Sequence, residues 1–343
     1  INTLSTETAQ EDKSHTCLLV AHVADMTENV LLSIAEHSKF STHVFRFDAM
    51  IRAIPMFNAD RFMLYLCRDL APDMVLFRHA KLTWRTLDPR VETLKAVKEQ
   101  LKIPVIGLYY DLAKPSFERL CRSYLPGLDG VVTFDSRLED HRVETSNVSV
   151  MTGWTPLPES VYFARSDERP IDVGFVGRIS AHYQGRARYL EGLRAAGINV
   201  EVRSQEDGIG LSIEEMGAFL RSCKIALNFS STAVISAWEL NDREPGEIPQ
   251  IDHVKGRVFE AIACGAMLFE SRNTVTTEYF TPDAHYTEFS DLDELVSKIQ
   301  YFLANDDHRQ RIASAGHQYF QEHYTARHFW RQVEELYTNA RSS

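Results

Sequence analysis

Residues 255–270, KGRVFEAIACGAMLFE, carry two cations and a carboxylate within the first turns of an apolar segment of helical spacing. Lys255 and Arg257 would lie in the first turn, where a positive side chain opposes the helix dipole and costs a few tenths of a kcal/mol. A bound anion would offset this cost. Glu260 follows three residues after Arg257, so its carboxylate can lie beside the anion and accept hydrogen bonds from a polyol such as a ribose.

A simpler interpretation of these residues is an ion pair within the helix. Lys255 and Arg257 stand five and three residues before Glu260, and oppositely charged side chains commonly pair at such spacings. Gly265 has a backbone explanation as the helix C-cap that leads into an apolar strand at 266–270. The spacing alone leaves both interpretations of the charged residues open.

A second group of cations follows the apolar run DVGFV, 172–176. Gly177 and Arg178 come directly after this run, and the next helix begins with Gln184, Gly185, Arg186, Ala187 and Arg188. Free N–H groups at a helix N-terminus already favour an anion, so these guanidinium groups predict an anion site. The alternative for Arg186 and Arg188 is a pair of solvated surface arginines, whereas Arg178 stands at the strand end itself.

Short β-rich runs alternate with stretches of helical period, which is typical of β-α-β units and parallel sheets. In the first half we expect strands at 17–23, 42–47, 73–78, 104–110, 130–134 and 148–153, with helices at 26–38 and 89–101. In the second half we expect strands at 172–178, 199–204, 224–230 and 266–270, with helices at 183–196 and 212–222. The predicted fold class is α/β, with two Rossmann-like, doubly wound parallel-sheet domains.

The expected boundaries follow from this alternation and from a proline-containing stretch with little regular signal. We expect a disordered tail at 1–15, an N-terminal acceptor-side domain at 16–155, a linker at 156–171, a C-terminal domain at 172–325, and a C-terminal helix at 326–343. The last helix is expected to pack back toward the N-terminal domain.

Composition limits the function classes. The chain has 343 residues, 44% hydrophobic and 25% charged, and a net charge of -11, which disfavours nucleic acid as a partner. No apolar run is long enough for a transmembrane segment, and the polar start lacks the features of a secretory signal, so a cytoplasmic location is expected. The five cysteines are scattered without a C-x-x-C pair, which predicts buried thiols rather than a metal site: Cys17, Cys67, Cys121, Cys223 and Cys264.

The stretch VKGRVFEAIACGAMLFE resembles the signature helix and strand of the group 1 glycosyltransferases, and its wording is closest to their spore-maturation-protein-like branch. DVGFVGRIS, KIALNFS and DHRQRIASAGHQYFQEHYT also resemble stretches of that family, in the expected order. The resemblance implies the GT-B fold, in which two Rossmann-like domains face across a cleft.

What the resemblance implies is an enzyme of hexosyltransferase type that moves a sugar from a nucleotide-sugar donor to a glycan, protein or small-molecule acceptor. Glu260 would hold the donor ribose, and Arg178 with Lys255 or Arg257 would stabilise the diphosphate, with Arg186 also on the donor side. Such charge stabilisation needs no metal, and no cofactor is expected.

The stereochemical outcome is left open by one departure from the family. Retaining members often show E-x7-E, and the position eight residues before Glu260 holds Asp252. We favour retention, with a shorter carboxylate near the sugar. The loop 236–250 before it is long and acidic, and is expected to gate the cleft; the alternative is a charged surface loop.

The acceptor side is expected at the strand ends of the first domain, where an inverting reaction would need a base. The candidates are His22 after the first strand, His79 after the third, and Asp111 after PVIGLYY. Tyr109 and Tyr110 would add aromatic surface for sugar stacking.

Two other classes of protein are alternatives to an enzyme of this kind. A two-lobed nucleotide- or sugar-binding protein without catalysis could keep the same fold, although the consistent set of cations and carboxylate favours the enzyme. A nicotinamide-dependent dehydrogenase would need glycines after its first strand, and CLLVAHVADM contains none.

Overall fold

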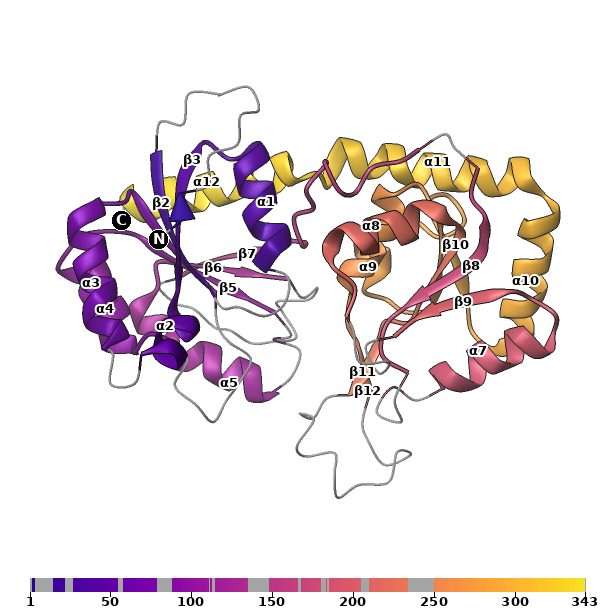
Figure 1. Cartoon of the computed structure of the whole chain (residues 1–343), viewed down its shortest axis with the longest axis horizontal. Coiled ribbons are helices and arrows are strands. Elements are labelled where there is room, and N and C mark those ends of the chain that lie inside the picture. The colour runs from indigo at the N-terminus through magenta and orange to yellow at the C-terminus, as the bar shows by residue number, and fades with distance from the viewer. Residues whose placement is uncertain are drawn as a thin grey trace, which may run out of the picture. The chain divides into compact units, whose positions relative to one another are not determined.

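The computed structural model describes residues 2–3, 15–21, 27–54, 58–78, 88–110, 112, 115–134, 148–165, 168–179, 183, 185–204, 210–233 and 250–342. The chain forms two compact units (Figure 1). Unit 1 comprises residues 1–158 together with 326–343, and unit 2 comprises residues 159–325.

Unit 1 contains a seven-stranded sheet in which β1 is antiparallel to its neighbour and the other strands are parallel. In spatial order the strands are β1 (Asn2–Thr3), β3 (Phe40–Arg46), β2 (His15–Ala21), β4 (Met74–Arg78), β5 (Val105–Tyr109), β6 (Gly130–Thr133) and β7 (Ser149–Thr152). Its helices are α1 (Thr27–His37), α2 (Phe47–Ala53), α3 (Ala59–Leu70), α4 (Val91–Glu99), α5 (Pro115–Tyr124) and α12 (Ala326–Ser342).

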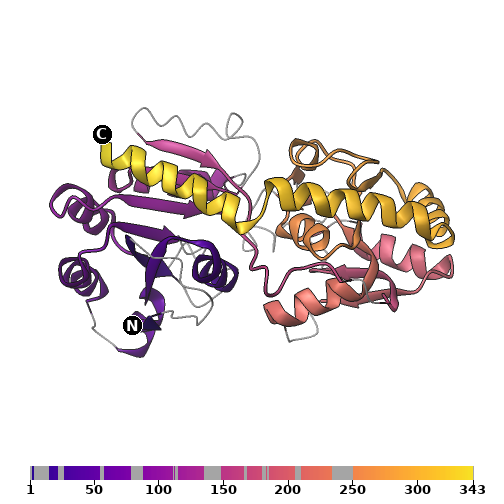
Figure 2. The same ribbon diagram turned by 90° about the horizontal axis from the view of Figure 1, so that it is seen from above.

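Helices cover the sheet of unit 1 because its central strands are apolar on both faces, as in other parallel sheets. Leu18, Val20 and Phe77 share one core with Met63 of α3 and Leu94 of α4. The last helix, α12, packs against β6, β7 and α1, and Figure 2 shows it in yellow along these strands.

Unit 2 contains a five-stranded, fully parallel sheet. In spatial order its strands are β14 (Thr287–Phe289), β13 (Met267–Ser271), β10 (Cys223–Asn228), β8 (Ile171–Val176) and β9 (Val200–Arg203). Two short antiparallel strands, β11 (Ser231–Ala233) and β12 (Gln250–Asp252), follow β10. The helices are α7 (Arg186–Ala195), α8 (Ile213–Ser222), α9 (Gly256–Ala263), α10 (Leu292–Ala304) and α11 (Asp306–His323).

Alternation along β8 explains how helices cover both faces of this sheet. Val173 and Phe175 belong to a core with Leu190 of α7 and Leu295 of α10. Gly174 faces the opposite side of the sheet. A Cβ at this position would lie 3.0 Å from the Phe219 ring of α8, so glycine lets this helix approach the sheet closely. Figure 1 shows α7 on one side of the sheet and α8 with α9 on the other.

The predicted α/β class with two doubly wound parallel sheets is confirmed. The expected strands occur with ends shifted by one or two residues, and the expected helices at 26–38, 89–101, 183–196 and 212–222 are α1, α4, α7 and α8. The prediction omitted α2, α3, α5, β11, β12 and β14, and also β1, which lies within the expected tail at 1–15. Three of these are strands of three residues, too short for a periodic signal.

All five cysteines are buried and unbridged, as predicted. Burial raises the pKa of each thiol to about 12. Within the described ranges, no helix combines the length and apolarity needed to cross a membrane, and no group of three or more His, Cys, Asp or Glu side chains could hold a metal ion.

Candidate functional site

The strand order of unit 2 reverses between β8 and β10, which lie side by side in parallel register. In open α/β sheets, ligands bind in the crevice outside the carboxyl ends of the strands at such a reversal. Gly177 and Arg178 follow β8 at this point, and Phe229 and Ser230 follow β10. This edge of unit 2 is therefore the candidate site.

Arg257 reaches this edge from the first turn of α9. Its Cζ and Nη2 lie 3.5 and 3.6 Å from the place that a Cβ on Gly177 would take, so the guanidinium rests against the end of β8. The Arg257 Nε is buried, and no atom of the described residues accepts a hydrogen bond from it. A buried donor left unsatisfied costs about 1–3 kcal/mol, so an external acceptor such as a phosphate oxygen would stabilise this side chain.

Lys255 stands at the N-cap of α9 and is held close to the end of β10. Its Nζ lies 3.1 Å from Nδ1 of His253, and the backbone N–H of His253 donates to the carbonyl of Ser230 at 3.1 Å. Hydrogen bonds thus link the lysine to the residues that follow β10.

Glu260 lies three residues beyond Arg257 in α9 and is 7% exposed. The Nε atom of Arg257 does not donate to Glu260, so this atom gives no support to the simpler interpretation of an ion pair within the helix. Asp252, eight residues before Glu260, is exposed at the end of β12, where it pairs in register with Ser231.

Arg186 occupies a different place from the other cations. It is 2% exposed, and its two terminal nitrogens donate to the carbonyls of Arg178 at 3.0 Å and Phe229 at 3.1 Å. Its guanidinium lies 4.1 Å from the ring centroid of Tyr183. Burial, and then the charge of Arg257, lower the pKa of Arg186 to about 10, so it stays protonated at neutral pH. Arg186 is therefore a buried cross-link between the residues that follow β8 and those that follow β10. Arg188 and Arg178, in contrast, are exposed.

One polar pair at this edge was not identified from the sequence. Glu270, the last residue of the apolar run AMLFE in β13, is fully buried, and Asn228 of β10 donates to it at 2.6 Å. A charged residue that ends an otherwise apolar strand is the signal that could have singled it out.

The acceptor-side candidates His22, His79 and Asp111 lie outside the described residues, as does the expected gate loop up to residue 249. The description reaches their neighbours Ala21, Arg78 and Tyr110.

The expected stacking surface of Tyr109 and Tyr110 is wrong, because both rings are buried, with exposures of 2% and 8%. The Tyr110 ring stacks on Phe134, with centroids 4.1 Å apart and planes 2° apart, and Arg78 lies 5.3 Å from its centroid. These aromatic residues belong to the core of unit 1.

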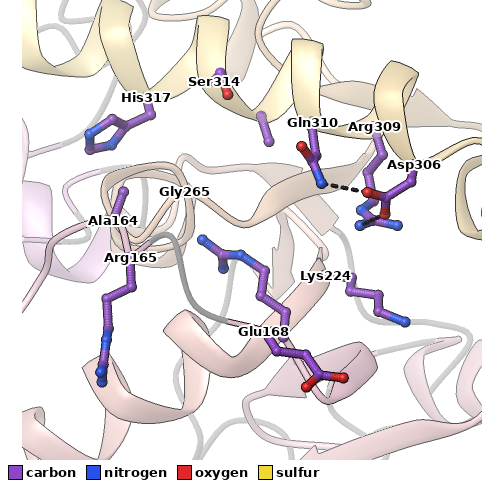
Figure 3. A pocket seen from close by; sticks show the side chains of 12 residues that line it. Ala164, Arg165, Glu168, Lys224, Gly265, Asp306, Arg309, Gln310, Ser314 and His317 are labelled. Atoms are coloured by element: carbon purple, nitrogen blue, oxygen red, sulfur yellow. Dashed lines mark hydrogen bonds and ion pairs between the residues drawn. The ribbon is translucent and has the colours of Figure 1, made fainter.

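A pocket of about 550 Å³ lies at the other end of unit 2, between one face of α11 and residues Ala164, Arg165, Glu168 and Arg169 (Figure 3). Lys224, near the start of β10, marks this as the amino-terminal edge of the sheet, and it pairs with Asp172 at 2.6 Å. In the pocket wall Gln310 and Arg309 both donate to Asp306. Because these polar groups are satisfied by one another, the pocket is a weaker ligand site than the strand-end edge.

Residues 186–335 match a family model described as glycosyl transferase-like. No curated protein matches the chain in sequence.

Solved structures match nearly the whole chain. HepE of Anabaena, in complex with UDP and glucose, is 12% identical with a TM-score of 0.62, covering 95% of this chain and 100% of that one. A glycosyltransferase from Rickettsia africae is 9% identical with a TM-score of 0.63, covering 95% and 98%. Sucrose-phosphate synthase from Thermosynechococcus elongatus is 12% identical with a TM-score of 0.62, covering 95% and 98%. The chain therefore has the fold of the GT-B glycosyltransferases, with two parallel-sheet α/β domains.

Proposed function

We propose that this protein is a glycosyltransferase that moves a sugar from a nucleotide-diphosphate sugar, bound by unit 2, to the hydroxyl of an acceptor. The observation that carries the proposal is the buried Arg257 Nε, which lacks an acceptor among the described residues while its guanidinium rests against Gly177. The match of residues 186–335 to the glycosyl transferase-like family supports it. Because HepE was solved with UDP and glucose, UDP is the first nucleotide to test.

The chemistry follows from the charges at the strand ends. Breaking the bond between the sugar and the diphosphate leaves negative charge on the departing diphosphate. Arg257, Arg178 and Lys255 would stabilise that charge, together with the N–H groups at the start of α9. Preorganised cations of this kind make the departure independent of a metal ion.

Glu260 would accept hydrogen bonds from the ribose hydroxyls, since it lies one helical turn beyond Arg257. Asp252 would lie near the sugar in place of the longer glutamate of E-x7-E proteins. We extend the proposal to retention of the sugar's configuration and to the spore-maturation-protein-like branch. If the reaction inverts instead, the base would come from His22, His79 or Asp111.

A nucleotide panel tests the proposal directly. The melting temperature of the full chain would be measured with UDP, GDP, dTDP and CMP, each with and without EDTA. One nucleoside diphosphate should stabilise the chain by about 2.7 kcal/mol at a hundred times its dissociation constant, and EDTA should not remove the effect. Stabilisation by none of the four would contradict the proposal. Binding without hydrolysis or transfer of the matching nucleotide sugar would point to the non-catalytic binding protein.

A further inference from the structure

Glu270 is a fully buried carboxyl group at the carboxyl-terminal edge of unit 2. It lies in β13 and is paired in register with Asn228 of β10 on one side and with Glu288 of β14 on the other. Burying a carboxyl group is costly unless hydrogen bonds compensate, so its partners decide what it does.

Those partners connect β13 to the residues after β10. The Asn228 side-chain amide donates to Oε2 of Glu270 at 2.6 Å, and the Ser271 hydroxyl donates to Oε1 at 3.3 Å. The backbone N–H of Ser230 donates to the Ser271 hydroxyl at 3.1 Å. Glu270 therefore helps to fix the position of Ser230.

Ser230 in turn positions the segment that carries the donor-side lysine. Its carbonyl accepts from the N–H of His253, whose Nδ1 lies 3.1 Å from Nζ of Lys255. Ser231, the next residue, pairs with Asp252 in the two-stranded sheet. A continuous series of hydrogen bonds thus runs from Glu270 to Lys255.

The charge of Glu270 acts on titratable groups of neighbouring elements. It opposes the lowering of the pKa of Arg186 in α7 and contributes to the raised pKa of Tyr286. Tyr286 and Glu288 belong to the neighbouring strand region, where the Tyr286 hydroxyl donates to Glu288 at 2.9 Å. Arg272, just after β13, lies 3.7 Å from Glu288. Burial raises the pKa of Glu270 to about 7, against the opposing effect of its hydrogen bonds from Asn228, Ser230 and Ser271.

We infer that Glu270 is a positioning residue of the donor site, which acts through Asn228, Ser271 and Ser230 to hold the segment that carries Lys255. The inference rests on the proposed function. The ionised form of Glu270 places a negative charge close enough to Arg186 to affect the pKa of that cation, at the edge of the sheet where we propose that the diphosphate binds. Donor binding should therefore favour the protonated form.

The test is calorimetric binding of UDP-glucose, whose diphosphate does not change its charge in the neutral range. Glu270→Ala should weaken binding about tenfold, since about 1.4 kcal/mol of hydrogen bonding that holds the segment is lost. Glu270→Gln, which keeps the shape and an acceptor for Asn228, should bind within about threefold of the unaltered chain at pH 6. Ser271→Ala removes one link of the series without altering a charged group, and it should weaken binding about threefold. This second variant keeps the inference testable if Glu270→Ala does not fold.

The pH profile separates positioning from mere structural support. The unaltered chain should bind UDP-glucose several-fold more tightly at about pH 6 than at about pH 8, and Glu270→Gln should bind alike at both. A Gln variant that keeps the pH dependence, or Ala variants at 270 and 271 that bind normally, would overturn the inference while leaving the proposed function intact. Failure of the unaltered chain to bind any nucleotide or nucleotide sugar would overturn both.

Discussion

The guanidinium of Arg169 donates to the carbonyl of Cys264 at 2.9 Å, at the C-terminal end of α9. The same side chain donates to the carbonyls of Arg221 at 3.0 Å and Cys223 at 2.9 Å, at the end of α8 and the start of β10. A cation at this place stabilises the C-terminal ends of both helices, because it opposes the negative end of each helix dipole. Arg169 therefore joins the first residues of unit 2 to the helix that carries Lys255, Arg257 and Glu260 at its other end.

Gly265 is required at this junction, and Gly265→Ala should destabilise unit 2. Its φ is +68°, and a Cβ would lie 2.9 Å from Cβ of Ala164 and 3.0 Å from Nη2 of Arg169. Gly197→Ala is the matched control, since Gly197 has a φ of +78° with nothing within 4 Å of a new Cβ. Urea unfolding should show a loss of about 1–2 kcal/mol for the control and clearly more for Gly265→Ala. Equal losses would mean that the contact with Arg169 adds nothing.

Arg257→Ala should weaken nucleotide binding by about tenfold to a hundredfold, because charge-assisted hydrogen bonds contribute about 1.5–3 kcal/mol. The free energy of unfolding without ligand should not fall, since the variant removes a buried donor that lacks an acceptor among the described residues. Calorimetry and urea unfolding measure the two quantities. Arg188→Ala, at an exposed position in α7, should leave both unchanged. A loss of stability that accounts for the lost binding would contradict the proposed role of Arg257.

Glu260→Ala should weaken nucleotide binding or turnover at least tenfold without unfolding the chain, because the carboxylate is proposed to hold the ribose. The test compares dissociation constants for the nucleoside diphosphate with those for the free inorganic diphosphate, which lacks a ribose. Only the first should change. Glu191→Ala in α7 is an exposed control. Parallel losses of thermal stability and of binding to both ligands would assign Glu260 a structural role instead.

Glu270 should also make the stability of the unliganded chain depend on pH. Its pKa is raised from 4.5 to about 7 in the folded state, so the folded chain holds this proton more tightly than the unfolded chain. The resulting stabilisation is complete below about pH 4.5 and is lost as the pH rises to about 7, by up to about 3 kcal/mol. Urea unfolding of the unaltered chain and Glu270→Gln across this range should show the variant gaining stability relative to the parent as pH rises. A constant difference would contradict the raised pKa.

The sequence made the elements around α9 predictable because several local signals agree there. Glycine at 265, the apolar period of the helix and the β-rich run after it all indicate a helix followed by a strand, as observed. Helix α3 also has a signal in the sequence, because Met63, Leu66 and Cys67 recur at helical spacing and are buried in the structure. The prediction did not include this helix.

The roles of Arg186 and Glu270 depend on contacts that local spacing does not encode. Arg186 looks like one more basic residue at a helix start, yet it donates to a carbonyl 43 positions away. Glu270 meets Asn228 only because β10 and β13 are neighbours in the sheet, although the two residues are 42 positions apart in the sequence. Such partners become known once the strand order is known.

The place of α12 has a consequence for the order in which the chain can fold during synthesis. Trp330 and Val333 are fully buried, and their helix completes unit 1 although all of unit 2 precedes it in the chain. A nascent chain that has reached residue 325 has every residue of unit 2 but still exposes the apolar surface of β6, β7 and α1. Unit 2 can therefore fold on the ribosome first, while unit 1 stays open and in need of protection from aggregation until its last helix emerges.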